Sequence, residues 1–191
     1  MMTVDIFNFS LIMYPLANIR ILKHIFKNYD KYVSKVKIQC GYDDATARFV
    51  TIRECILLHK EIIKYVDDYN FVLSNVSLLD YLQSSLEFAT IILQMNNENS
   101  FYSVFFVTTC GLCAISRLFI FYLYADQLTF EASGIGQAAF ESNWYEQPKE
   151  IKQMVITIIM RCNKEVSLSI GPFDKMSLKT FVVVSKIAIV F

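Results

Sequence analysis

Two long apolar stretches stand out in the pattern of hydrophobic and polar positions along the chain. The clearer one, residues 101–125, holds a single charged side chain, Arg117. As an α-helix at about 1.5 Å per residue it rises about 37 Å, more than the roughly 30 Å hydrocarbon core of a bilayer. The pattern therefore predicts a transmembrane helix, which with its flanking residues covers 101–132.

The second apolar stretch, residues 71–95, carries two carboxylates, Asp80 and Glu87. Before it, residues 49–66 place apolar side chains at spacings of three and four, the period of one helix face. The members of this face are Ile52, Cys55, Ile56, His59, Ile63 and Val66. We expect one long helix over residues 49–95, amphipathic where it begins and apolar where it enters the membrane.

Arg117 is the one charge within the clearer stretch, and a charge at that depth needs a partner or a route to water. The polar run NNENS at residues 96–100 predicts a turn, across which Asp80 or Glu87 could meet the guanidinium group. Alternatively, the long side chain extends from a tilted helix to the inner interface. The sequence leaves both interpretations open.

Basic residues gather ahead of the apolar stretches. Of the 18 Lys and Arg residues, ten lie between Arg20 and Lys64, and none lies between Tyr65 and Ser116. By the positive-inside rule, residues 28–48 are a cytoplasmic segment, and residues 3–27 are the end of a transmembrane helix. The composition agrees with a membrane protein: 54% of residues are hydrophobic and 19% charged. The formal net charge of zero gives no support for binding nucleic acid.

A polar island follows the clearer stretch. It reads AAFESNWYEQP at residues 138–148, contains the one tryptophan, Trp144, and ends in Pro148, a residue suited to the first position of a helix. Residues 149–164 then show an apolar face, but they are too few and too charged to span a membrane. We predict a cytoplasmic region over residues 138–165, with its helix packed at the inner surface.

The last residues, 176–191, are apolar and rich in β-branched side chains. In a soluble protein they would form a strand, but in a membrane setting we expect a final helix that re-enters the bilayer. Together the segments predict an all-α fold, a polytopic transmembrane helix bundle with a cytoplasmic region.

Three features that suggest chemistry lack the context that the chemistry needs. GIGQAA at 134–139 fits the glycine pattern of a dinucleotide site, but no strand precedes it, so we interpret it as a flexible turn and set a soluble oxidoreductase aside. Cys110 and Cys113 have the gap of a zinc half-site without a second pair, which favours core packing on one helix face. His24 and His59 accompany no nucleophile motif. We predict no enzymatic activity, no metal and no cofactor.

An aromatic stripe marks the first part of the clearer stretch. Tyr102, Phe105, Phe106 and Thr109 recur there at spacings of three and four. Aromatic rings with nearby hydroxyls can line a pocket for a small, mostly apolar ligand. Ordinary helix packing is the alternative interpretation.

Three segments of the C-terminal half share their order and spacing with a known pattern. They are AAFESNWYEQP at 138–148, the helix that ends in Ile159, Met160, Arg161 and Cys162, and SLSIGPFDKMSLKTF at 167–181. The pattern has a Trp-Tyr pair and a proline, an Arg-ended helix, a glycine-containing turn, and a Ser-Leu-X-X-Phe opening of the last helix. By these segments the chain resembles the insect odorant receptors, a family of seven-helix membrane proteins. Phe140 stands where that family often has Tyr.

The resemblance implies the C-terminal part of a seven-helix receptor subunit, about half the family's usual length, with residues 1–30 matching the end of the fourth helix. Such a subunit joins a shared odorant coreceptor in a heterotetramer, an odour-gated cation channel in the plasma membrane of olfactory sensory neurons. Its ligand is a small apolar volatile molecule, and its surroundings are membrane lipid. The alternative is a helical membrane scaffold or transporter fragment without odorant binding.

The resemblance also implies roles for particular residues. A cytoplasmic anchor that holds the subunits together would include Trp144, Tyr145, Pro148 and Arg161. The truncated last helix, 176–191, would line the pore through Phe181, Val184, Ser185 and Ala188, with the gate falling past Phe191.

Overall fold

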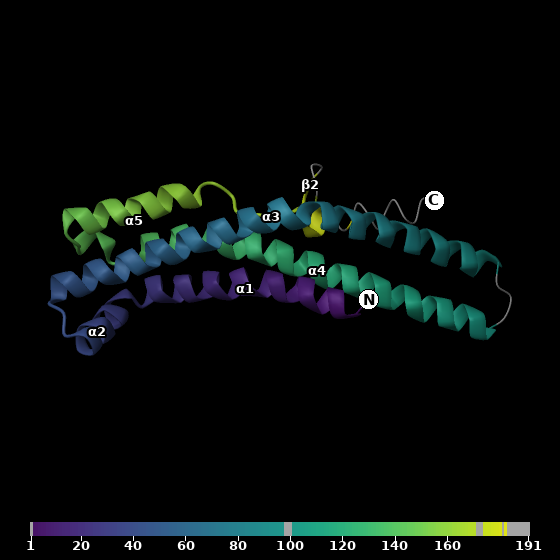
Figure 1. Ribbon diagram of the computed structural model, residues 1–191, viewed down its shortest axis with the longest axis horizontal. Helices are drawn as coiled ribbons and strands as arrows, with labels where there is room; N and C mark the ends of the chain where they lie inside the picture. The colour runs from purple at the N-terminus through teal and green to yellow at the C-terminus, as the bar shows by residue number, and fades with distance from the viewer. Residues whose placement is uncertain (1, 98–100, 171–173, 181, 183–191) are drawn as a thin grey trace. The chain divides into compact units, whose positions relative to one another are not determined.

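Helices make up almost all of the part of the chain that the structure describes. The computed structural model describes residues 2–97, 101–170, 174–180 and 182. In chain order (Figure 1) the elements are α1 (Met2–Lys27), α2 (Tyr29–Cys40), α3 (Asp44–Asn97), α4 (Phe101–Glu141), the short 3₁₀ helix η1 (Trp144–Glu146), α5 (Lys149–Cys162), β1 (Ser169–Ile170) and β2 (Asp174–Lys175). The predicted all-α class is confirmed, and the exception among the described residues is one hairpin whose two strands have two residues each.

The elements belong to two compact units, each built from segments that are far apart in the sequence. The first unit comprises Met1–Asp67 and Gln127–Val166, and the second comprises Asp68–Asp126 and Ser167–Phe191. The long helices α3 and α4 therefore contribute to both units.

The first unit has a continuous apolar core. On α1 the buried side chains recur every three or four residues: Ile12, Leu16, Ile19, Leu22 and Phe26. On α3 they are Ile52, Cys55, His59, Ile62 and Val66. The predicted apolar face of residues 49–66 was wrong at one position, because Ile62 is buried where Ile63 was expected. An α-helix repeats every 3.6 residues, so its buried stripe turns gradually around the axis and leaves Ile56 and Ile63 half-buried at its edge.

A glycine ends helix α2 within the predicted cytoplasmic segment. Gly41 has φ 67°, in the left-handed region, and its N–H donates to the carbonyl of Lys37 at 3.0 Å. This conformation closes a helix end at little cost only for glycine. The chain can then turn into α3 at Asp44.

Helix α4 runs without interruption from Phe101 to Glu141, so the interpretation of GIGQAA as a flexible turn was wrong. One of the two glycines serves packing instead. A Cβ at Gly134 would lie 2.8 Å from Lys23 Nζ, and one at Gly136 would lie 3.1 Å from the Cβ of Cys162. Glycine at 136 therefore lets α5 approach α4 closely, whereas at Gly134 the neighbour is only the flexible end of the Lys23 side chain.

The second unit leaves most of its apolar side chains uncovered. In α3 and α4, among the described residues, stretches long and apolar enough to cross a membrane are only 14% and 17% buried. A core helix of a soluble protein would be mostly buried, so these faces are suited to lipid. Cys110 and Cys113 are both exposed, which makes the expectation of core packing wrong for them. On a lipid-facing helix, apolar and weakly polar side chains need no protein cover.

After α5 the chain forms an antiparallel hairpin rather than continuing as helix. Ser169 pairs with Lys175 and Ile170 with Asp174. Beyond it, residues 178–180 and 182 are helical, and the hydroxyl of Ser177 accepts the N–H of Thr180 at 3.3 Å. A serine that accepts from the third residue of a helix is a typical N-cap. The last helix therefore opens at the predicted Ser-Leu step.

Candidate functional site

The segment around Trp144 connects α4 to α5 by a short 3₁₀ turn. The half-buried Trp144 packs against Phe140, with ring centroids 6.4 Å apart, and its indole N–H donates to the Phe140 carbonyl at 3.2 Å. The backbone at the end of α4 thus satisfies the hydrogen-bonding need of the Trp144 indole. Helix α5 begins at Lys149, so Pro148 is the residue before the helix rather than its first residue. Tyr145 is 59% exposed.

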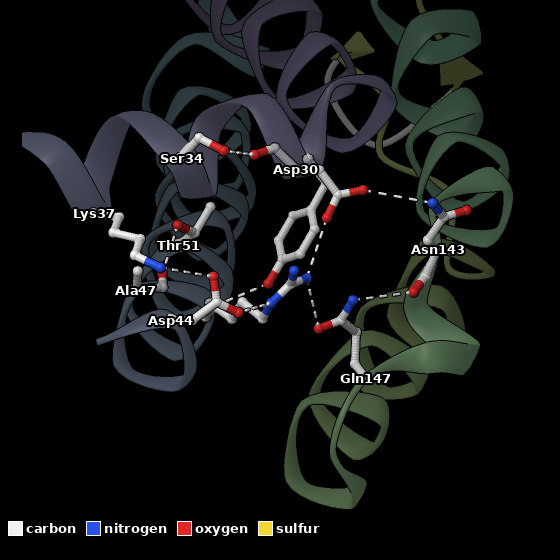
Figure 2. A network of polar contacts seen from close by, with 10 residues as sticks. Asp30, Ser34, Lys37, Asp44, Ala47, Thr51, Asn143 and Gln147 are labelled. Carbon is white, nitrogen blue, oxygen red and sulfur yellow. Dashed lines mark hydrogen bonds and ion pairs between the residues drawn. The ribbon is translucent and has the colours of Figure 1, made fainter. Parts of the chain in front are cut away.

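A network of polar contacts centred on Arg48 connects this segment to two other helices (Figure 2). Arg48 Nε donates to Asp44 Oδ2 at 2.8 Å within α3, and Arg48 Nη1 donates to Asp30 Oδ1 of α2 at 3.1 Å. The same Nη1 donates to Gln147 Oε1 at 3.2 Å, next to η1. A planar guanidinium with several donors suits such a junction, because it can bond in several directions at once.

Two buried residues, Gln147 and Tyr29, make further hydrogen bonds that hold the network in place. The Gln147 side-chain amide donates to the Asn143 carbonyl at 3.2 Å, so both ends of this buried side chain are bonded. The buried Tyr29 donates its hydroxyl to the Arg48 carbonyl at 2.9 Å, and burial raises the pKa of Tyr29 well above its usual range. Tyr29 therefore stays neutral and remains a hydrogen-bond donor at physiological pH. The turn before α5 is fixed to α2 and α3 by satisfied hydrogen bonds.

Helix α5 presents apolar side chains in two directions. Ile151, Val155 and Ile158 are buried in the first unit. Ile156 and Met160, together with Tyr145 before the helix, are large, apolar and exposed. An outward-facing set of this kind is a feature of surfaces that bind another protein.

Arg161 lies at the opposite end of α5 from Pro148, about 20 Å of helix away. The structure therefore brings Trp144, Tyr145 and Pro148 together, but not Arg161 with them. Arg161 instead lines an open groove of about 420 Å³ between α5 and the first part of α3, which run side by side (Figure 1).

His59 and Cys162 lie beside each other where α3 meets the end of α5. The Cys162 sulfur is 3.7 Å from His59 Nε2, and both line a small cavity of about 20 Å³ with Thr129 and Ser133 of α4. Such a cavity holds about one water molecule. Burial raises the pKa of the Cys162 thiol to about 11, so it is an unreactive thiol at neutral pH. His59, which accompanies no nucleophile motif, is thus a buried packing residue.

The four candidate ligand residues lie on α4 in the second unit, and all are exposed within this chain. They are Tyr102, Phe105, Phe106 and Thr109. The Thr109 hydroxyl donates to the Phe105 carbonyl at 2.9 Å, a bond within the helix. They line neither of the two cavities described above, and their ligand role stays a prediction. The candidate pore residues Phe181, Val184, Ser185 and Ala188 lie outside the described residues.

Arg117 reaches across from α4 to α3. Its Nη2 donates to the hydroxyl of the buried Ser84 at 2.9 Å. Glu87, one of the two carboxylates considered as partners, accepts a bond from Gln83 Nε2 at 3.0 Å, and the side chain of Asp80 lies outside the described residues. Arg117 thus has an uncharged partner, the Ser84 hydroxyl, which a search for carboxylates in the sequence could not indicate.

Asn70 holds the chain segment that follows α5, and sequence reasoning missed it. Its Nδ2 donates to the Ser167 carbonyl at 2.9 Å. Its Oδ1 accepts the Ser169 N–H at 2.9 Å and the Ser169 hydroxyl at 3.2 Å. We call these three bonds the Asn70 clasp. An asparagine in a helical pattern gives no signal of this role, because its partners are nearly a hundred positions away.

Comparison with known proteins agrees with this architecture. The 7tm Odorant receptor family model matches residues 1–189. Odorant receptor Or2 of Anopheles gambiae is 26% identical over 133 residues, 70% of this chain and 35% of that receptor. The odorant receptor coreceptor of Anopheles gambiae is 26% identical over 125 residues, 64% of this chain and 26% of the coreceptor. The chain therefore spans about a third or less of the length of these relatives.

A solved structure shows the same fold. The insect olfactory receptor OR5 from Machilis hrabei, in complex with eugenol, superposes with a TM-score of 0.79 at 13% sequence identity. The match covers 99% of this chain and 46% of that receptor. With the family model matching nearly the whole chain, the chain belongs to the seven-transmembrane odorant receptor family, a family of membrane receptors and not of enzymes.

Proposed function

We propose that the chain forms part of an odorant receptor subunit that assembles with the odorant coreceptor into an odour-gated cation channel of the plasma membrane of olfactory sensory neurons. The observation that carries the assembly is the exposed apolar surface formed by Tyr145, Ile156 and Met160. We call it the outer α5 surface. The Arg48 network fixes the turn that carries Tyr145, and a preorganised surface loses less entropy on binding.

The same proposal assigns the ligand and the pore. The exposed Tyr102, Phe105, Phe106 and Thr109 are available to helices that would complete a pocket for a small volatile ligand. The last helix, which opens at Ser177, would lead toward the pore. Ligand binding shifts a closed-to-open equilibrium only as far as the ligand prefers the open state.

The assembly role is tested by replacing Tyr145 with Ala. The chain is placed behind the N-terminal helices of Anopheles gambiae Or2 and expressed with the coreceptor. Tyrosine is enriched among the few interface residues whose truncation costs about 2 kcal/mol or more, so we expect co-purification to fall at least about tenfold. The matched control is Phe130→Ala, another aromatic of the first unit, 73% exposed, on α4. Equal retention of the coreceptor by both variants contradicts the assembly role.

The channel role is tested by odour-evoked current. Cells that express the same chimaera with the coreceptor should show cation currents to members of a broad panel of volatile compounds. Cells with the coreceptor alone give the background. Intact assembly without any odour-dependent current would favour the alternative, a membrane scaffold without odorant binding.

A further inference from the structure

The groove between α3 and α5 combines an apolar floor with a basic rim. Its aliphatic lining comes from Ile56, Ile63, Met154 and Ile158. Its cationic lining comes from Lys60, Lys64 and Arg161. Among the lining residues of the described chain, Asp67 is the one carboxylate. The groove therefore carries a net positive charge next to hydrocarbon surface.

Arg161 has unused hydrogen-bonding capacity in this groove. Its Nη1 is buried and has no hydrogen-bond partner within the described residues. A buried guanidinium nitrogen without a partner is costly, and a phosphate or carboxylate in the groove would satisfy it once the Arg161 side chain turns outward. Glu61, on the same turn of α3 as Lys60, is directed elsewhere, since it accepts a bond from Tyr14 of α1 at 3.5 Å.

The position of the groove along α3 suits a lipid. Lys64 precedes Phe71, where the apolar stretch begins, by seven residues, or about 10 Å of helix. The headgroup layer adds only about 5–8 Å to each side of the hydrocarbon core, so Lys64 lies just outside it, within reach of phosphates on an inositol ring that projects from the anionic cytoplasmic leaflet. The orientation rests on the proposed function and on the predicted cytoplasmic location of residues 28–48 and 138–165, both in the first unit.

We propose that this groove binds the phosphorylated headgroup of an anionic inositol phospholipid. The phosphates contact Lys60, Lys64 and the guanidinium group of Arg161, and the glycerol backbone packs on Ile63 and Ile158. Three cations match a headgroup that carries several phosphates better than one that carries a single net charge. The apolar floor favours a lipid over a soluble inositol phosphate.

The test measures binding of dioctanoyl phosphatidylinositol 4,5-bisphosphate to the purified full chain in detergent. The groove variant is Lys60→Gln with Lys64→Gln, both exposed lysines. At about a fivefold effect per lysine, we expect affinity to fall about 10- to 30-fold. The matched control replaces Lys27 and Lys31, two other exposed lysines four residues apart, by Gln and should keep the affinity within about twofold. Circular dichroism and gel filtration establish that both variants stay folded.

Several results would overturn the proposal. Equal loss in the groove and control variants would mean non-specific charge attraction. Inositol 1,4,5-trisphosphate binding as tightly as the lipid would identify a soluble phosphate as the occupant. Dioctanoyl phosphatidylcholine binding equally well would exclude recognition of the phosphates. Because the assay needs neither a coreceptor nor a current, its failure leaves the receptor role intact, and failure of the receptor assays leaves this measurement unchanged.

Discussion

Arg48 is the residue on which the geometry of the turn before α5 depends most. It is half-buried, with 26% of its side chain exposed, and one of its nitrogens is shared between Asp30 and Gln147. Exposed ion pairs contribute little, but the bond to the buried Gln147 is different. Without Arg48 the side-chain oxygen of Gln147, Oε1, would stay buried without its hydrogen-bond donor. An unsatisfied buried acceptor of this kind destabilises the fold.

We expect Arg48→Ala to lower the stability of the full chain in detergent by about 1–2 kcal/mol, a fall in Tm of roughly 2–8 °C. Thermal unfolding followed by circular dichroism gives the measurement. Arg53→Ala serves as the control, since Arg53 is an exposed arginine of the same helix. If both variants lose the same stability, the Arg48 network contributes nothing specific.

At this scale the sequence indicated residue types better than partners. The three-and-four spacing on α3 found Ile52, Cys55, His59 and Val66 correctly, because local periodicity determines which face is buried. Arg48 could not be found in this way, since Gln147 lies 99 positions away. The same holds for Gly136, whose packing against Cys162 depends on a contact between two helices.

At the scale of elements, the order of the long helices was predicted better than some of their ends. The 49–95 helix corresponds to α3, and the helix after the polar island corresponds to α5. The predicted end of the second span at residue 132 was too early, because glycine in a helical pattern was taken for a break. Helix propensity is a weak local preference, and packing of α5 against Gly136 overrides it.

The Asn70 clasp makes the segment after α5 a defined element rather than a loose connection. We expect Asn70→Ala to expose the Ser169 amide, which loses its acceptor, so that its hydrogen exchange becomes at least about tenfold faster. Hydrogen–deuterium exchange with mass spectrometry of peptides covering residues 165–170 measures this.

The control for this exchange experiment is Asn163→Ala. Asn163 is an exposed asparagine at the end of α5 and leaves the clasp untouched. Unchanged protection of the Ser169 amide in Asn70→Ala would show that other contacts hold the segment. A tenfold change in both variants would mean that the end of α5, rather than the clasp, controls exchange.

At the scale of the whole molecule, the distribution of burial distinguishes a membrane protein from a soluble one. The first unit has a buried apolar core and exposes some large apolar side chains, such as Phe130 and Met160, whereas the second leaves most of its apolar side chains exposed, among them Phe71 and Tyr102. The sequence predicted these exposed stretches from their length and hydropathy together with the absence of Lys and Arg over most of them. It could not predict the division into two units, which depends on contacts between distant segments.

The orientation of the chain is tested by a membrane-impermeant maleimide on intact cells, with Cys110 and Cys113 replaced by Ser. We expect the exposed Cys40 to be labelled only after the plasma membrane is permeabilised. Cys162 should stay unlabelled near pH 7, because its raised pKa of about 11 leaves almost no thiolate. Mass spectrometry of the labelled peptides distinguishes the two sites.

A variant with the opposite expectation completes the orientation experiment. Tyr102→Cys in the same background places a thiol at the exposed start of α4. Because residues 138–165, beyond the other end of this membrane span, are predicted to be cytoplasmic, the start of α4 should lie outside the cell. Labelling of this thiol in intact cells is therefore expected. Labelling of Cys40 before permeabilisation would reverse the proposed topology and remove the basis of a cytoplasmic anchor.

The Asn70 clasp has a consequence for how such receptors can diversify. Two of its three bonds engage main-chain atoms, the carbonyl at 167 and the amide at 169, which almost any amino acid supplies. Substitutions at both positions should be tolerated in a saturation-mutagenesis screen, apart from proline at 169, which has no amide hydrogen. The linker can then change its side chains from one paralogue to the next, while the asparagine that holds it stays under selection.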